Sequence, residues 1–258
     1  VFPCQSEVYL MLTLSQQIIN LCNAFTLEFI LKAAWNTLTL SAIGCSAGLI
    51  AGFIIACLRQ TRHVVFLPLR VVTIVLVELL RRIPFLVTLF LIFFIFQGIG
   101  IDLSFYFIGL IAVCLIASAY MAEIFRTGFE SVPKTQIEAA QTLNFSHRQL
   151  IQLVMLPQAL RVVIPPAFSF MVSFIKDTAL ASQLGVVELT FSAKILISRG
   201  YSSFLIYGLI LLIYFVMSYP LSRLGKRLEQ RLAAGKTARD TSKSGETQSN
   251  PLSTLTPP

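Results

Sequence analysis

The chain contains a stretch of 20 uncharged residues, LSFYFIGLIAVCLIASAYMA, at positions 103–122. A helix needs about 20 mostly apolar residues to cross the hydrocarbon core of a bilayer, so this stretch predicts a membrane-spanning helix. Residues 33–58, 83–101 and 200–222 are also uncharged, and a shorter run at 162–175 extends to 187 if Lys176 and Asp177 are tolerated within it. We therefore expect five spans, at about 34–58, 64–97, 104–125, 163–185 and 203–222.

The overall composition agrees with this prediction. Of 258 residues, 56% are hydrophobic and only 12% are charged, and the mean hydropathy is +0.79. A soluble domain carries about 25% charged residues and has no room to bury so much apolar surface. A disordered chain is far more polar, and a membrane β-barrel needs alternating strands that these runs do not show. The sequence predicts an all-α integral membrane protein.

The distribution of basic residues indicates the orientation. The chain has 20 Lys and Arg against 12 Asp and Glu, a net charge of +8. With the N-terminus outside and five spans, 16 of the 20 basic residues fall on the cytoplasmic side. The positive-inside rule therefore favours an outside N-terminus and a cytoplasmic C-terminus. The basic segment 223–231 then lies against anionic lipid headgroups, and no nucleic-acid partner is expected.

Two terminal segments flank this membrane domain of residues 28–232. Residues 1–27 form an extracytoplasmic or interfacial segment, because their apolar part is interrupted by polar residues and lacks a basic start. A sixth span there is an alternative. Residues 233–258 are rich in Gly, Ser, Thr and Pro, which predicts a disordered cytoplasmic tail.

Three glycines give the first span a helix face without side chains. Gly44, Gly48 and Gly52 are each four residues apart, a spacing that lets two membrane helices approach closely. Packing within the chain and contact with a second copy both fit this pattern.

A proline divides the second span. Residues 64–97 would reach about 51 Å at about 1.5 Å per residue, against a hydrocarbon core of about 30 Å. Pro84 removes a backbone donor and clashes with the preceding turn, so we expect the helix to break there.

The longest polar insertion between spans, about 126–161, predicts two short helices. Residues 138–140 are good helix formers, and Asn144 suits the left-handed position that ends a helix. Ser146 and Gln149 form a capping box that opens the second helix, and Pro157 ends or kinks it. This hairpin is either an amphipathic element lying on the membrane or a docking element for a cytoplasmic partner.

Several motifs resemble a known family. Glu138-Ala139-Ala140, the turn at Asn144 and Leu156-Pro157 resemble the EAA loop of permease subunits of bacterial ABC importers. The surrounding motifs are similar to those of polar amino acid permeases of the histidine, glutamine and arginine type: VELLRRIP at 77–84, YMAEIFR at 120–126, KDTAL at 176–180 and GVVEL at 185–189. The resemblance covers about residues 28–232. The family usually has Gly at the position of Asn144, and Gly-Thr at the position of Arg82-Ile83.

This resemblance implies an architecture and a set of partners. The fold would be the five-helix core of a type I ABC importer permease, in the inner (cytoplasmic) membrane of a bacterium. Two permease subunits, identical or paralogous, would form the path for polar amino acids. A pair of ATP-binding subunits would dock beneath them, and a periplasmic or extracytoplasmic binding protein would deliver the substrate. The residues implied in ATPase coupling are Glu138, Ala139, Ala140, Leu143, Asn144, Leu156 and Pro157.

The chain has no recognisable chemistry of its own. Gly235-Lys236-Thr237 resembles the end of a phosphate-binding loop, but Gln230 stands where the first glycine is required. The five cysteines fit no metal or redox spacing, and no catalytic triad or carboxylate pair is visible. We expect no enzyme activity, cofactor or metal. The alternative function is an ion-coupled secondary transporter or channel, although the sequence shows no internal repeat.

Charges near the membrane are costly and usually functional. The candidates for a substrate path or gate are Glu78, Arg82, Glu123, Lys176 and Asp177. The alternative is that Glu78 pairs with Arg82, and Glu123 with Arg126, simply to hold helices. Glu188 is expected either to contact the binding protein or to pin the outer loop.

Overall fold

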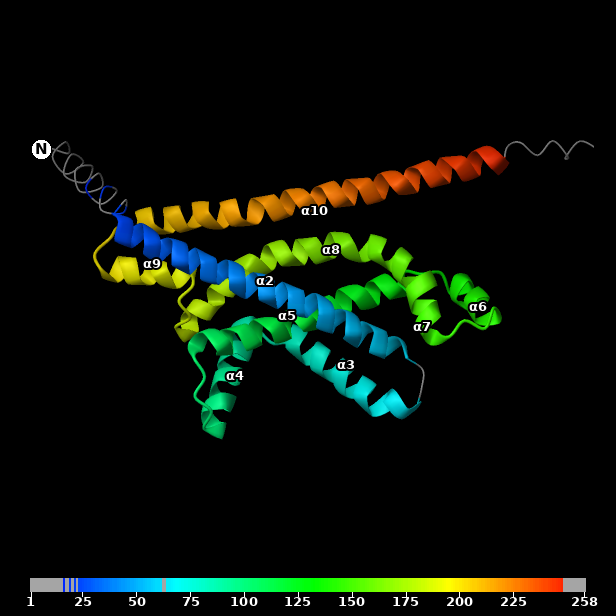
Figure 1. The fold of residues 1–258 in the computed structure, drawn as a ribbon, viewed down its shortest axis with the longest axis horizontal. Coiled ribbons are helices and arrows are strands. Elements are labelled where there is room, and N and C mark those ends of the chain that lie inside the picture. The colour runs from blue at the N-terminus through cyan, green and yellow to red at the C-terminus, as the bar shows by residue number, and fades with distance from the viewer. Residues whose placement is uncertain (1–15, 17–18, 20, 22, 62–63, 248–258) are drawn as a thin grey trace, which may run out of the picture.

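The structure is a computed structural model that describes residues 16, 19, 21, 23–61 and 64–247. The described residues form helices (Figure 1): α2 (Ala24–Gln60), η1 (Val64–Phe66), α3 (Leu67–Arg82), α4 (Phe85–Ile99), α5 (Phe105–Glu130), α6 (Lys134–Thr142), α7 (His147–Gln149), η2 (Leu150–Met155), α8 (Leu156–Asp177), η3 (Thr178–Leu184), α9 (Leu189–Ser198) and α10 (Ser203–Thr247). Here η1 and η3 are 3₁₀ helices and η2 is a π-helix.

The predicted spans are present. Four described helical segments are long and apolar enough to cross a membrane: Ala24–Gln60, Phe105–Glu130, His147–Leu184 and Ser203–Leu232. The helices α3 and α4 meet the same criteria only as a pair, which is bent by 118° and makes a fifth span if the pair is counted as one. Pro84 lies at this bend as the residue that precedes α4, which confirms the predicted break.

The glycine stripe packs within the chain. A Cβ atom built on Gly48 would lie 2.7 Å from the Cβ of Ala117, and one built on Gly52 would lie 2.6 Å from the Cβ of Met121, both in α5. Gly44 meets Val113 of α5 in the same way. The contact between α2 and α5 is the most extensive between any two described elements. The intrachain alternative is therefore the one that the structure shows.

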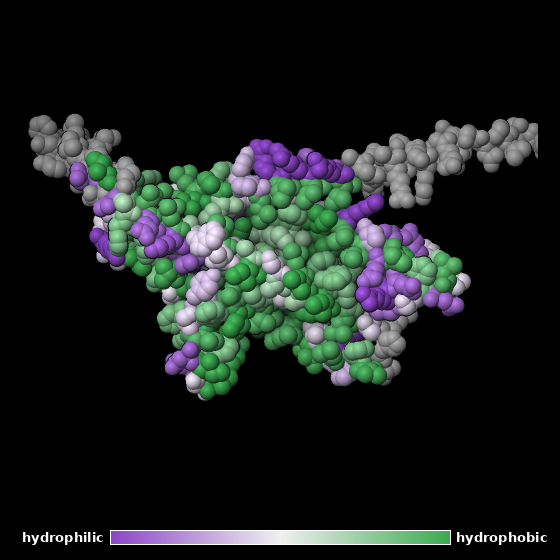
Figure 2. Space-filling view, in the orientation of Figure 1, coloured by the Kyte–Doolittle hydropathy of each residue, from purple (hydrophilic) through white to green (hydrophobic). Residues whose placement is uncertain are grey.

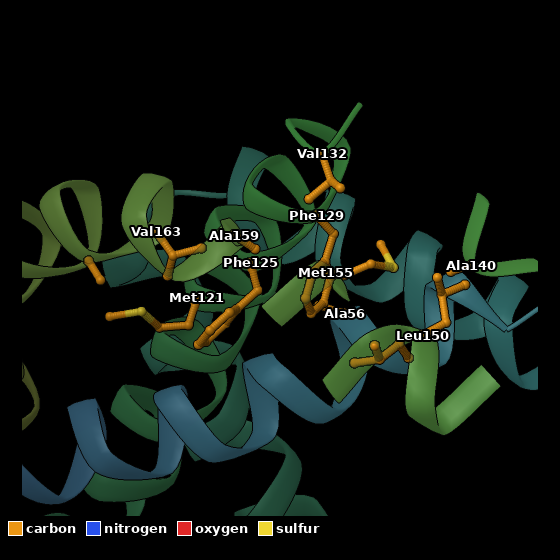
Figure 3. Close-up of a cluster of buried hydrophobic side chains, with 12 residues drawn as sticks. Ala56, Met121, Phe125, Phe129, Val132, Ala140, Leu150, Met155, Ala159 and Val163 are labelled. Atoms are coloured by element: carbon orange, nitrogen blue, oxygen red, sulfur yellow. The ribbon is translucent and has the colours of Figure 1, made fainter. Parts of the chain in front are cut away.

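A separate apolar core holds the hairpin to the bundle (Figure 3). Phe129 of α5 and Met155 of η2 are buried in it, and Ala140 of α6 is 4% exposed. The cluster continues along α5 and α8 through Met121, Phe125, Ala159 and Val163. We call the end of the molecule formed by α6, α7 and η2 the hairpin end; α9 and the start of α2 lie at the opposite end (Figure 1).

The two predicted terminal segments lie at the limits of the described residues. The helix α10 continues to Thr247, where the sequence predicted disorder from residue 233. Leu, Ala, Lys and Arg, which favour helix, recur after residue 223, and they extend the helix beyond its apolar part. Residues 248–258 and most of the predicted segment 1–27 lie outside the described residues, and α2 begins at Ala24.

The close packing of α2 on α5 can be tested with one methyl group. In Gly48→Ala the new Cβ would lie 2.9 Å from the backbone carbon of Ala117, which cannot rotate away. Such overpacking costs about 1–3 kcal/mol, so we expect a melting temperature several degrees lower in detergent. Gly208→Ala is the matched control, because Gly208 of α10 has no neighbouring atom within 4 Å of a built Cβ. Equal melting temperatures for the two variants would contradict the packing.

Candidate functional site

The helix α6 divides its EAA residues between two environments. Ala140 faces inward onto Leu150 and Met155, whereas Glu138 and Ala139 are exposed. The side chain of Gln158 donates to that of Gln136 at 2.6 Å and ties α6 to the start of α8. Within the motif, Ala140 therefore anchors α6 in the core, whereas Glu138 and Ala139 lie on its exposed surface.

The turn after α6 has the predicted geometry. Asn144 has a φ of 56°, the only positive φ among the described non-glycine residues, which confirms the left-handed position. The N–H of Phe145 donates to the carbonyl of Ala140 at 3.1 Å and closes the helix end. Leu143, immediately before the turn, is 70% exposed. An apolar side chain is thus presented beside Glu138 and Ala139.

The second helix begins as predicted but does not end as predicted. Ser146 accepts from the backbone N–H of Gln149, whose side chain in turn accepts from the backbone N–H of Ser146, so the capping box is present. The helical path then continues through η2 into α8. Pro157 therefore lies inside a continuous helical path, two residues after the six-residue π-helix η2. The helix does not end at Pro157, and a π-helix next to a proline is a common cause of a kink.

A cleft opens beside α6. Its volume is about 440 Å³, and it lies between α6 and the ends of α2 and α5. Phe129, Ile137 and Met155 supply apolar walls, and the charged side chains Glu130 and Glu138 also line it. The hairpin end therefore offers a cleft lined by both apolar and charged side chains.

Glu123 is the centre of a charge network. It accepts from the Nε of Arg126 at 2.9 Å, as the spacing predicted. In addition, its carboxylate lies 3.4 Å from Nη1 of Arg81 and 3.5 Å from Nη1 of Arg59. The Glu123 side chain is 16% exposed and that of Arg59 is 10% exposed. One carboxylate thus joins α2, α3 and α5.

Three of the five candidate path residues belong to this network. Glu78 pairs with Arg82 at 3.1 Å, as predicted, and lies 4.0 Å from Arg81, which contacts Glu123. Arg82 is 81% exposed. Lys176 and Asp177 are also exposed but lie elsewhere, at the last residues of α8, away from the hairpin end (Figure 1). Sequence reasoning missed Arg59 and Arg81, because only the packing of three helices brings them to Glu123.

Glu188 pins a loop at the opposite end. Its side chain is completely buried, accepts from the backbone N–H of Phe191 at 2.8 Å and from the hydroxyl of Tyr214 at 2.9 Å. Next to it, the N–H of Leu189 donates to Thr37 of α2 at 3.0 Å. The carboxylate caps α9 and connects it to α10, so the structure favours the pinning role.

These observations define a class of protein: a helical membrane protein of four or five spans that presents a folded helical hairpin at one end. A family model described as "Binding-protein-dependent transport system inner membrane component" matches residues 48–234. The chain belongs to this family and is a multi-pass protein of the bacterial inner membrane.

Relatives share most of this length. The probable glutamine ABC transporter permease protein GlnP of Bacillus subtilis is 39% identical over 61% of this chain and 73% of its own. The L-cystine transport system permease protein TcyB of the same organism is 38% identical over 77% of this chain and 84% of its own.

Solved structures share the fold. A chain in the crystal structure of an amino acid ABC transporter with histidines matches with a TM-score of 0.72 and 30% identity, over 79% of this chain and 94% of that one. A chain of the inward-facing MetNI methionine ABC transporter matches with a TM-score of 0.68 at 17% identity, over 81% of this chain and 99% of that one, which shows the fold alone.

The charge network leads to a stability prediction. Glu123→Gln removes the carboxylate that three arginines share in a partly buried network, and the loss of hydrogen bonds between charged groups costs about 1.5–3 kcal/mol. We expect a strongly lowered melting temperature and faster tryptic cleavage within 59–82. The control is Glu130→Gln, because Glu130 also pairs with Arg126 but is 56% exposed, where a pair contributes about 0–1 kcal/mol. If both variants melt alike, Glu123 does not hold α3.

The turn at Asn144 leads to a second prediction. Asn144→Gly should leave the melting temperature almost unchanged, because glycine adopts a φ of 56° without strain. Asn144→Ile should destabilise the hairpin by about 1–2 kcal/mol, because a β-branched residue clashes in the left-handed region. Limited proteolysis of residues 143–146 measures the difference. Equal protection of both variants would show that the turn does not depend on this backbone conformation.

Proposed function

We propose that the chain is the permease subunit of an ATP-driven importer of polar amino acids, and that α6 is its contact with the ATP-binding subunits. The observation that carries the proposal is the exposed face of α6, on which Glu138, Ala139 and Leu143 project from a helix whose Ala140 is locked into a core. Relatives with this fold are named as amino-acid, glutamine or L-cystine permeases, which supports the substrate class.

The packing around α6 supports transmission of force. The core that receives Ala140 also contains Phe129 of α5 and Ala159 of α8. A load applied to α6 therefore reaches the ends of two spans through side chains in van der Waals contact. Interiors packed in this way shift between discrete arrangements rather than deforming continuously. In this proposal the ATP-binding subunits hydrolyse ATP, and this chain forms the path that the substrate crosses.

The proposed orientation follows from charge. The hairpin and the basic segment 223–231 of α10 would face the cytoplasm, and the start of α2 would face outside. A second permease subunit, identical or paralogous, would complete the path, and an extracytoplasmic binding protein would deliver the substrate. Lys176 and Asp177 then belong to the outer gate, and Glu78 with Arg82 to the path beside the break at Pro84.

Reconstitution tests the proposal. With candidate ATP-binding subunits and binding protein in liposomes, the chain should give amino-acid-stimulated ATP hydrolysis and uptake. The variant Glu138→Lys reverses a charge on the exposed face of α6. We expect ATP hydrolysis and uptake each to fall at least about tenfold, because a misplaced charge at an interface costs several kcal/mol.

The matched control is Glu28→Lys. Glu28 is also an exposed glutamate, but it lies near the start of α2 at the opposite end of the molecule. This variant should retain activity and subunit co-purification. Uptake by the chain alone, driven by an ion gradient, would instead support the secondary transporter. Unchanged coupling in Glu138→Lys would remove α6 from the docking surface.

A further inference from the structure

A groove lies between α8 and α10, beside a close contact of the two helices. The contact is made at Gly225, where a built Cβ would lie 3.0 Å from the Cβ of Phe168. The groove has a volume of about 260 Å³ and belongs to neither the hairpin nor the Glu123 network.

The lining of this groove is amphipathic. Phe168, Val172 and Leu221 supply apolar walls toward the apolar part of α10. Ser222, Lys226 and Glu229 line the remainder, on the following turns of the same helix. An occupant that fits both parts has an apolar portion and a polar portion joined end to end.

The surface around the groove is strongly cationic. Segment 223–231 carries four exposed basic residues against the single acidic residue Glu229. Arg223 lies over the ring of Tyr219 at 5.0 Å, which holds its charge in place beside an aromatic ring. Figure 2 shows a hydrophilic patch that interrupts the apolar surface at α10. The net positive charge matches an anionic headgroup.

The position along α10 fits a membrane interface. Residues 203–222 carry no charge, and the first basic residue follows directly at Arg223. The apolar walls of the groove therefore lie at the edge of the hydrocarbon region, and Lys226 lies one turn further, at the depth of lipid phosphates.

We propose that this groove binds one anionic phospholipid. An acyl chain packs against Phe168 and Val172, and the phosphate accepts from the ammonium of Lys226 and the hydroxyl of Ser222. A free phosphate would use only the polar half of the groove. Since α10 packs mainly on α8 and α9, the lipid adds a third contact that holds α10 to the span leading from the hairpin. This inference does not depend on how α6 docks.

The test measures lipid binding to the full chain in detergent. Phosphatidylglycerol and phosphatidylcholine are titrated separately, and bound lipid is counted by native mass spectrometry while the melting temperature is followed. We expect preferential retention of phosphatidylglycerol and a rise in melting temperature. Lys226→Gln should weaken phosphatidylglycerol binding about fivefold, as expected for one cation at a lipid surface, and Lys226→Arg should retain it.

Two further variants separate the groove from general attraction. Ser169→Phe places a ring in the groove from an exposed position and should abolish the preference without changing any charge. Lys32→Gln removes a cation at the opposite end of the molecule and should have no effect. Normal binding in Ser169→Phe, or an equal loss in Lys226→Gln and Lys32→Gln, would overturn the proposal. Displacement of the lipid by inorganic phosphate would also overturn it, because the site would then be a free-anion site.

Discussion

The fold depends on how closely α2 approaches α5. Within a bilayer, burial of apolar groups gives little drive for helices to associate, so close contact must supply the attraction. Gly44, Gly48 and Gly52 allow that contact, since each meets a side chain or backbone atom of α5 with no room for a methyl group. With α2 fixed on one face of α5, its other faces receive α3, α4 and α8. The helix α5 thus lies at the centre of the described helices and contacts α2, α3, α4 and α8.

Toward the hairpin end, α5 makes a different kind of contact with its neighbours. Glycine contacts give way to the aromatic core around Phe125 and Phe129, and to the carboxylate of Glu123 with its arginines. An apolar core fixes the position of α6, whereas the charge network fixes α2 and α3 relative to α5. Because Glu123 and Phe129 lie on the same helix, any displacement of the hairpin reaches both sets of contacts together.

Local signals in the sequence predicted local features well. The lengths of the uncharged stretches predicted the spans, and Pro84 predicted the break in the second one. Asn144 predicted the left-handed turn, and the spacing of Ser146 and Gln149 predicted the capping box. Each of these features depends on residues that are close together in the sequence. Contacts between different helices were not predictable from these local signals. The partner of the glycine stripe, and the approach of Arg59 and Arg81 to Glu123, depend on helices far apart in sequence. The helix α10 extends beyond residue 232 into the predicted tail, where Ala, Lys and Arg between the Gly, Ser and Thr residues favour helix.

The broken second span connects the two ends of the molecule. Its first half, α3, is tied by Arg81 to Glu123 of α5, toward the hairpin end. Its second half, α4, packs through Leu89 on α5 and on Leu184 of η3, near the opposite end. Both halves pack on α5, and α4 packs on η3 as well, so a movement of η3 relative to α5 would have to be absorbed between α3 and α4, at residues 83–84. The exposed Arg82 lies at that junction. If α6 docks as we propose, a movement of the hairpin would reach the backbone around Pro84, where the exposed Arg82 can change position with little displacement of the core.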